Sequence, residues 1–237
     1  MPREPPVVYL YPLSNYQQGG KGPLLEKDAS VKERMIRMAD LYKKFGMRRV
    51  VEGLLLAHEH SHPHVLLLQI GNTYFKLPGG RLRVGEHETD GLRRKLSNKL
   101  GTPNADSTIN WQVGELVSTW WRPNFETVMY PYIPPQVATP KECRKIFLTQ
   151  LPPTGILGVP KNLKLLAVPL FELYDNAHRY GPVIASLPQL LARIKFVFCD
   201  HNAQPLINEH INAYQISNIQ VYHKVQKDKA QREKNKQ

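Results

Sequence analysis

The stretch "GGRLRVGEHETDGLRRKLSNKLGT", Gly79–Thr102, decides the fold and raises the question of function. Its two glycines break the strand-like run before them, and a helix is expected over residues 86–100. Within that helix Lys95, Asn98 and Lys99 are spaced i, i+3 and i+4, so they share one face. Mg²⁺ prefers oxygen ligands, and an ammonium group repels it. The face is therefore unsuited to holding a metal ion.

The segments around this stretch indicate a mixed α/β domain. "SVKE", Ser30–Glu33, is a capping box, and the helix that it opens is expected to end at Gly46. A turn around His60–Pro63 is expected to join two long strands. Strands are predicted at residues 48–59, 62–70, 73–77, 111–121, 127–134, 145–151 and 163–171, and a last helix at 186–194. Strands surrounding two or three helices predict a mixed α/β sandwich.

Composition sets the expected boundaries and the class of partner. Residues 1–29 are expected to form an extended segment, residues 30–200 the domain, and residues 201–237 an extension with a basic, disordered end. The chain has 32 Lys and Arg against 20 Asp and Glu, a formal charge of +12. This balance favours a polyanionic partner, nucleic acid before anionic lipid. No apolar run approaches the length of about 20 residues that a membrane span needs, so no membrane partner is expected.

The opening stretch resembles the Nudix box, G-x(5)-E-x(7)-R-E-U-x-E-E-x-G-U, where U is aliphatic. The positions that match are Gly80, Glu86, Arg94, Leu96 and Gly101. The three remaining glutamates are replaced by Lys95, Asn98 and Lys99, and the last aliphatic position by Thr102. In that family the loop–helix–loop holds a divalent metal against a pyrophosphate. The replacements therefore imply a Nudix fold that is not an enzyme and that uses no metal or other cofactor.

A wider resemblance is to the small (25 kDa) subunits of pre-mRNA cleavage factor I, most of all the plant members. It covers residues 8–196 and includes "WWRPNFE", "PLFELYDNA" and "YGPVIASLPQLLARI". It implies a Nudix-like α/β/α sandwich with a mixed sheet that forms a homodimer in the nucleus. It also implies binding to UGUA elements in single-stranded RNA, and to a larger cleavage factor subunit that carries an RNA-recognition motif. The implied role is pre-mRNA 3′ end cleavage and polyadenylation.

The resemblance carries over eight RNA-contacting positions. They are Glu26, Arg34, Glu52, Thr73, Tyr74, Leu77, Tyr180 and Gly181. In such a site aromatic rings stack on bases, and charged or backbone groups read the base edges. Glu26 or Glu52 would accept from guanine, and Arg34 would donate to base or phosphate oxygens.

Three points about these residues stay open in the sequence. Tyr74 follows a tight turn and Tyr180 is expected in a loop before Gly181, so both rings are expected to be exposed. Strand alternation nevertheless sends Tyr74 and Phe75 to opposite faces, and one of the two is expected in the core. Glu52 and Arg34 could equally form a structural ion pair.

The run "AHEHSHPH" suggests a metal site because His58, His60, His62 and His64 alternate. A strand would place all four on one face, but Ser61 and Pro63 favour a turn that separates them. A solvated loop is the preferred interpretation.

Two other functions compete with RNA binding. The first is an active Nudix hydrolase of nucleoside polyphosphates, against which Lys95 and Lys99 argue. The second is a protein–protein scaffold without RNA specificity, for which the basic charge is incidental.

Overall fold

The computed structural model describes residues 5–24, 27–102 and 109–206 of the 237-residue chain. The chain forms two compact units, residues 1–203 and 204–237, and all the elements named below lie in the first. The expected basic end of the chain and the candidate residue Glu26 lie outside the described residues. Among the described residues, no helix is both long and apolar enough to cross a membrane.

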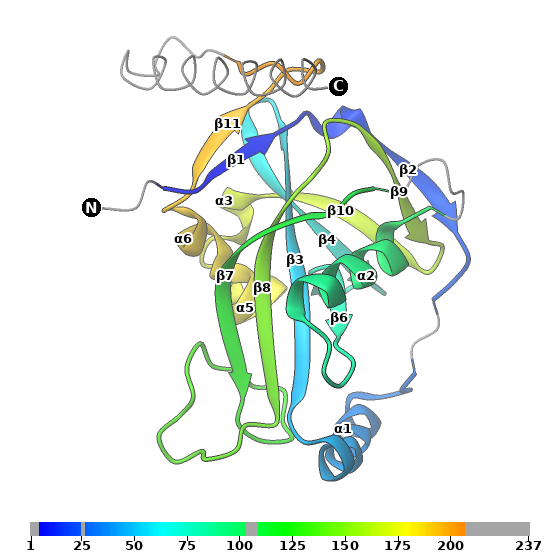
Figure 1. Cartoon of the computed structure of the whole chain (residues 1–237), viewed down its shortest axis with the longest axis vertical. Helices are drawn as coiled ribbons and strands as arrows, with labels where there is room; N and C mark the ends of the chain where they lie inside the picture. Colours follow the sequence, from blue (N-terminus) through cyan, green and yellow to red (C-terminus); the bar gives the residue numbers. More distant parts are fainter. Residues whose placement is uncertain (1–4, 25–26, 103–108, 207–237) are drawn as a thin grey trace, which may run out of the picture. The chain divides into compact units, whose positions relative to one another are not determined.

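The strands and helices follow one another along the first unit as labelled in Figure 1. The strands are β1 (Val7–Leu10), β2 (Tyr16–Lys21), β3 (Arg48–Glu59), β4 (His62–Ile70), β5 (Tyr74–Lys76), β6 (Gly79–Arg81), β7 (Gln112–Arg122), β8 (Glu142–Gln150), β9 (Gly155–Pro160), β10 (Leu163–Pro169) and β11 (Lys195–Phe198). The helices are α1 (Val31–Phe45), α2 (Glu88–Leu100), α3 (Leu170–Leu173), α4 (Ala177–Tyr180), α5 (Pro182–Ala185) and α6 (Leu187–Leu191), with a 3₁₀ turn at Leu13–Asn15.

The main sheet has the strand order β10-β4-β3-β8-β7, with β5 added to β4 and β6 added to β3. Strands β3 and β8 are parallel and the other pairs are antiparallel, so the sheet is mixed. The expected extended segment at the start of the chain contributes β1 and β2, which pair in parallel with β11 and β9.

Both faces of the sheet are covered, and this explains the long apolar runs of the two central strands. In β3, Leu54 and Leu56 join one core cluster, while Leu55 joins the other. The first cluster contains side chains of α5 and α6, and the second contains Leu92 and Leu96 of α2. The two sets of helices thus cover opposite faces (Figure 1), and the expected α/β/α sandwich is confirmed.

Local signals predict several elements correctly. Helix α1 starts after Ser30, whose hydroxyl accepts from the Glu33 amide at 3.2 Å, and ends at Gly46, where φ is +71°. The strands predicted at residues 48–59 and 62–70 are β3 and β4, and the turn between them has positive φ at His60 and Ser61.

Two predicted elements are wrong in whole or in part. Residues 127–134 form no strand and contribute only a single bridge between Tyr130 and Trp121. Pro131 and Pro134 lack the amide protons that a strand ladder requires, which accounts for the difference. The helix predicted over residues 186–194 is limited to the five residues of α6.

Candidate nucleic-acid interface

Strand β3 places Glu52 at the centre of the candidate site. Glu52 faces Gly79 of β6 across the ladder, and its residue is 7% exposed. Its ion-pair partner is Arg144 of β8, with Nη1 3.5 Å from Oε1, rather than Arg34. Burial raises the pKa of Glu52, and Arg144 offsets only part of that effect. Arg34 lowers the pKa of this carboxylate less than Arg144 does, and among the described residues no hydrogen bond or ion pair joins Arg34 to Glu52.

Behind Glu52 lies a buried network of charges that the sequence analysis missed. Glu142 is fully buried, and Arg144 Nη2 donates to its Oε1 at 3.1 Å. The Nε atoms of Arg48 and Arg122 lie 3.3 and 3.6 Å from its Oε2. Burial alone raises the pKa of Glu142, but the three guanidiniums outweigh it and hold the pKa below its usual value. With Glu52 included, three cations face two carboxylates.

The sequence holds one indication of this network, which is the even spacing of its charged residues within each strand. Arg48 and Glu52 stand at even spacing in β3, and Glu142 and Arg144 do so in β8. Residues at even spacing share a face of a sheet. The pairing of β3 with β8, which brings the two sets together, joins segments about 95 residues apart and has no local signal.

The choice between Tyr74 and Phe75 is resolved by the register of β5. Tyr74 is 46% exposed, whereas Phe75 is 7% exposed and belongs to the core. Tyr74 therefore offers an exposed ring on which a base could stack.

The expectation of an exposed Tyr180 ring is wrong. Tyr180 is the last residue of the short helix α4 and is 6% exposed. Its ring centroid lies 4.8 Å from that of Phe75, and its hydroxyl donates to Glu172. Burial, followed by the hydrogen bond to Glu172, raises its pKa to about 12. Tyr180 therefore supports Phe75, the neighbour of Tyr74, from the core side.

The remaining predicted residues differ in accessibility. Gly181 ends α4 with φ of +79° and has open space where a side chain would project. Thr73 is exposed in the turn before β5. Leu77 is buried in the core, so its side chain is not available to a ligand.

The carboxylates of the Nudix-like loop and helix form hydrogen bonds with neighbouring cationic side chains of the same protein. Glu86 accepts from Arg94 at 2.6 and 2.5 Å, and this bond, followed by the Arg83 amide, lowers its pKa to about 2. Glu88 accepts from Lys145 at 2.8 Å and from Arg49 at 3.1 Å. The stretch is thus held in shape by ion pairs.

These residues do not fit a divalent metal ion. Lys95 lies over Gly80, with its Nζ 3.6 Å from the point where a Cβ on that glycine would stand. Glu86 and Glu88 are the most buried of the acidic residues that remain in this stretch. Each of them already forms an ion pair with a cationic side chain. Within the described part of the chain, no three His, Cys, Asp or Glu side chains form a metal-binding group. The histidine run is not the solvated loop that the sequence favoured, because His58 in β3 and His64 in β4 are both buried. His58 contacts the Cys199 carbonyl and His64 the His62 carbonyl, both at 2.8 Å.

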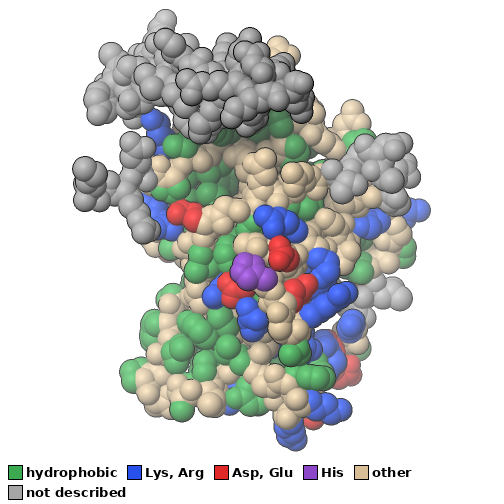
Figure 2. Space-filling view, viewed as in Figure 1, with side chains coloured by type: hydrophobic (Ala, Val, Ile, Leu, Met, Phe, Trp, Pro, Cys, Tyr) green, Lys and Arg blue, Asp and Glu red, His purple; other side chains and the backbone are tan. Residues whose placement is uncertain are grey.

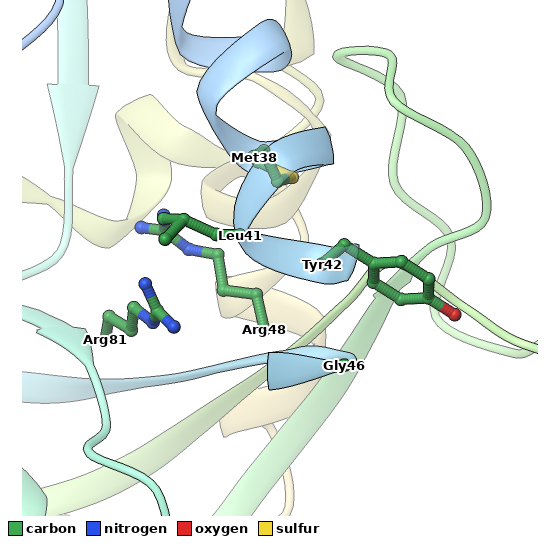
Figure 3. A pocket seen from close by; sticks show the side chains of 6 residues that line it. All are labelled: Met38, Leu41, Tyr42, Gly46, Arg48 and Arg81. Carbon is green, nitrogen blue, oxygen red and sulfur yellow. The ribbon is translucent and has the colours of Figure 1, made fainter. Parts of the chain in front are cut away.

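A shallow hollow lies next to the Gly79–Arg81 strand. It is lined by Met38, Leu41, Tyr42, Gly46, Arg48 and Arg81. Figure 3 shows the Arg48 and Arg81 side chains beneath α1 and turned toward the same space. Arg48 is paired with Glu142, and Arg81 brings a second guanidinium to the hollow.

Comparison with known proteins gives a consistent set of relatives. A Nudix family model described as a nucleotide hydrolase matches residues 6–194. Pre-mRNA cleavage factor Im 25 kDa subunit 2 of Arabidopsis thaliana is 62% identical over 190 residues, which are 80% of this chain and 95% of that protein. Subunit 1 of the same organism is 50% identical over 80% of this chain and 86% of its own length. Cleavage and polyadenylation specificity factor subunit 5 of Dictyostelium discoideum is 49% identical over 81% of this chain and 96% of its own length.

Proposed function

Because the chain belongs to the family of pre-mRNA cleavage factor Im 25 kDa subunits, we propose that it is the RNA-reading subunit of such a factor. In this role it binds UGUA elements in single-stranded pre-mRNA and promotes 3′ end cleavage and polyadenylation. Like the relatives that it matches, it works as a subunit of a complex, and its place of work is the nucleus.

The observations that carry this proposal are the exposed ring of Tyr74 and the pairing of Glu52 with Arg144. A base stacked on such a ring gains about 1–3 kcal/mol, without regard to its identity. Which base is bound then depends on the protein groups that form hydrogen bonds with the edge of that base. The carboxylate of Glu52 accepts from guanine N1–H and N2–H₂, while Arg34 donates to base or phosphate oxygens. Tyr180 contributes by holding Phe75 in place, and Thr73 and Gly181 offer further contacts at the rim.

Catalysis is not part of the proposed function. The three glutamates that would collect metal in a Nudix box are Lys95, Asn98 and Lys99 here, and Glu86 is paired with Arg94. Without metal there is no activated water and little stabilisation of a leaving phosphate. The loop–helix–loop therefore serves as a support for Gly79 and Gly80, which lie against Val51 and Glu52.

Assembly completes the proposal. A homodimer would present two such sites, and two UGUA elements on one transcript would then bind with increased avidity.

A larger subunit with an RNA-recognition motif needs a contact surface of its own. The segment between β7 and β8 exposes Val128, Tyr130, Tyr132 and Ile133, and Figure 2 shows hydrophobic side chains gathered at that end of the molecule. Exposed apolar groups in one patch are typical of interaction sites.

The test is fluorescence anisotropy with a short UGUA-containing RNA and a scrambled control, in EDTA and then in Mg²⁺, with product analysis on the same samples. Preference for UGUA that persists in EDTA, with intact RNA, is the expected result. Equal weak binding to both RNAs would favour a scaffold without RNA specificity. Cleavage or nucleotide release that requires Mg²⁺ would show an active hydrolase.

A further inference from the structure

The Glu52 carboxylate is nearly buried and has a single ion-pair partner within the described part of the chain. Its side chain is 9% exposed, and its Oε1 lies 3.5 Å from Arg144 Nη1. Among the described residues, neither oxygen of Glu52 accepts a hydrogen bond. A nearly buried carboxylate without hydrogen bonds is costly. Both oxygens therefore keep their acceptor capacity for a ligand that presents two adjacent N–H donors, as guanine does.

Strand pairing places Arg144 where its side chain reaches Glu52. In the parallel β3–β8 pair, Val50 stands opposite Arg144, and Glu52 is two residues further along β3. Residues two apart share a face of the sheet, so Arg144 and Glu52 are diagonal neighbours on one face. On the other side of β8, Trp120 of β7 stands opposite Arg144. Val50 and Trp120 are both buried, so Arg144 leaves the sheet between two packed apolar residues.

The guanidinium of Arg144 is shared between two carboxylates. Its Nη2 donates to Glu142 Oε1 at 3.1 Å, while its Nη1 faces Glu52. Arg48 and Arg122 also neutralise Glu142, so Arg144 is not its sole partner. A guanidinium is planar and rigid, and anchoring one of its nitrogens therefore fixes the direction of the other. Glu142 thus sets the position of the group that holds Glu52.

The charge of Arg144 also favours the ionised form of Glu52. Burial raises the pKa of Glu52, and Arg144 is the largest of the effects that oppose it. Lys76 of β5 and Arg34 of α1 lower this pKa by less, and Glu142 raises it. A protonated carboxyl carries an O–H donor, which would face the N–H donors of guanine. Ionised Glu52 is therefore the form that guanine requires.

We propose that Arg144 is a positioning residue for the guanine of UGUA. Its guanidinium, anchored on Glu142, holds the Glu52 carboxylate ionised and in the orientation that accepts from guanine N1–H and N2–H₂. Arg144 acts through Glu52 and does not itself bind the RNA. The inference rests on the proposed function, because it concerns the guanine that Glu52 reads. It gives the buried charge network a role in base selection as well as in stability.

The first measurement compares anisotropy titrations with UGUA and with UIUA, in which inosine lacks the N2 amino group of guanine. Wild type should bind UGUA about ten-fold more tightly, the loss expected for one hydrogen bond to a charged group. Arg144→Gln should bring this UGUA/UIUA ratio close to one, because Glu52 is no longer held. Arg144→Lys keeps the charge but not the two-pronged geometry, so its ratio should be intermediate.

The second measurement is the pH dependence of UGUA binding, from neutral to acidic pH. Binding should be lost as Glu52 becomes protonated. In Arg144→Gln this loss should occur at higher pH than in wild type, because Arg144 no longer lowers the pKa of Glu52. Arg144→Lys should restore the wild-type pH dependence. A merely structural role of Arg144 would not move this profile.

Arg122→Gln is the matched control for lost stability. It removes a cation from the same buried Glu142, whereas no ion pair joins Arg122 to Glu52 in the described ranges. It should lower Tm by an amount similar to that of Arg144→Gln and keep the larger share of the UGUA/UIUA ratio. Thermal unfolding of each variant sets a temperature for the titrations at which all of them are folded.

The outcomes separate this inference from the proposed function. Equal binding of UGUA and a scrambled RNA by wild type would overturn both. UGUA preference over scrambled RNA, with a wild-type ratio and pH dependence in Arg144→Gln, would overturn only the inference. An equal loss of the ratio in Arg122→Gln would also overturn it, because the effect would then be structural. If Arg144→Gln does not fold, Arg144→Lys decides: a reduced ratio supports the inference, and a wild-type ratio overturns it.

Discussion

Replacing Glu142 by glutamine should cost this protein a large part of its stability. Glu142 is fully buried and lies 3.1–3.6 Å from nitrogen atoms of Arg144, Arg48 and Arg122. Glutamine keeps the shape and removes the charge, so little of the effect comes from a cavity. Removing one partner from a buried ion pair costs about 3–5 kcal/mol, because the remaining charges are left uncompensated. For a unit of this size that loss lowers Tm by about 6–20 °C.

The assay is urea unfolding followed by tryptophan fluorescence, since Trp111 and Trp120 are buried. An unchanged slope with a lower midpoint would identify a change in stability rather than in the denatured state. Glu115→Gln is the matched control: its carboxylate is exposed and 3.7 Å from Arg193, and such a surface pair contributes about 0–1 kcal/mol. If Glu142→Gln cost no more than this control, the account of the network as a charge-compensated unit would be refuted.

Three further predictions concern the ring, pH and the tail. Tyr74→Ala should weaken UGUA binding by about 1–3 kcal/mol, whereas Tyr74→Phe should change it little. Equal losses in an anisotropy titration would assign the contact to the hydroxyl. The folded-state pKa of Glu86 is lowered from 4.5 to about 2, so its contribution to stability is present above pH 4.5 and is lost as pH falls toward 2. Arg94→Met should remove the larger share of this acid-dependent part, since the Arg83 amide remains, and identical pH profiles of Tm in the two proteins would contradict it. Deleting residues 224–237, which hold six Lys or Arg, should flatten the salt dependence of RNA binding. An unchanged slope would mean that these residues do not contact RNA.

The sequence alone determined the elements whose causes lie within a few residues. A capping serine and a terminal glycine define α1. Continuous apolar runs define β3 and β4, because both faces of each strand are buried. The replacement of three acidic positions by Lys95, Asn98 and Lys99 could also be read directly, since side-chain chemistry does not depend on the fold. The resemblance to cleavage factor subunits rests on the same local runs, and the relatives bear it out.

Tertiary structure decided which side chains face solvent and which charges meet. Alternation indicated that Tyr74 and Phe75 point in opposite directions, but the packing of Tyr180 against Phe75 determines that Tyr74 is the exposed ring. Glu142 finds its partners because β3, β7 and β8 lie side by side, although their sequences are far apart. Burial and charge compensation depend on such distant pairings, and no short stretch of sequence encodes them. The strands and helices that carry the site therefore follow from local sequence, whereas the ion pairs of the site follow from the pairing of strands that are distant in the sequence.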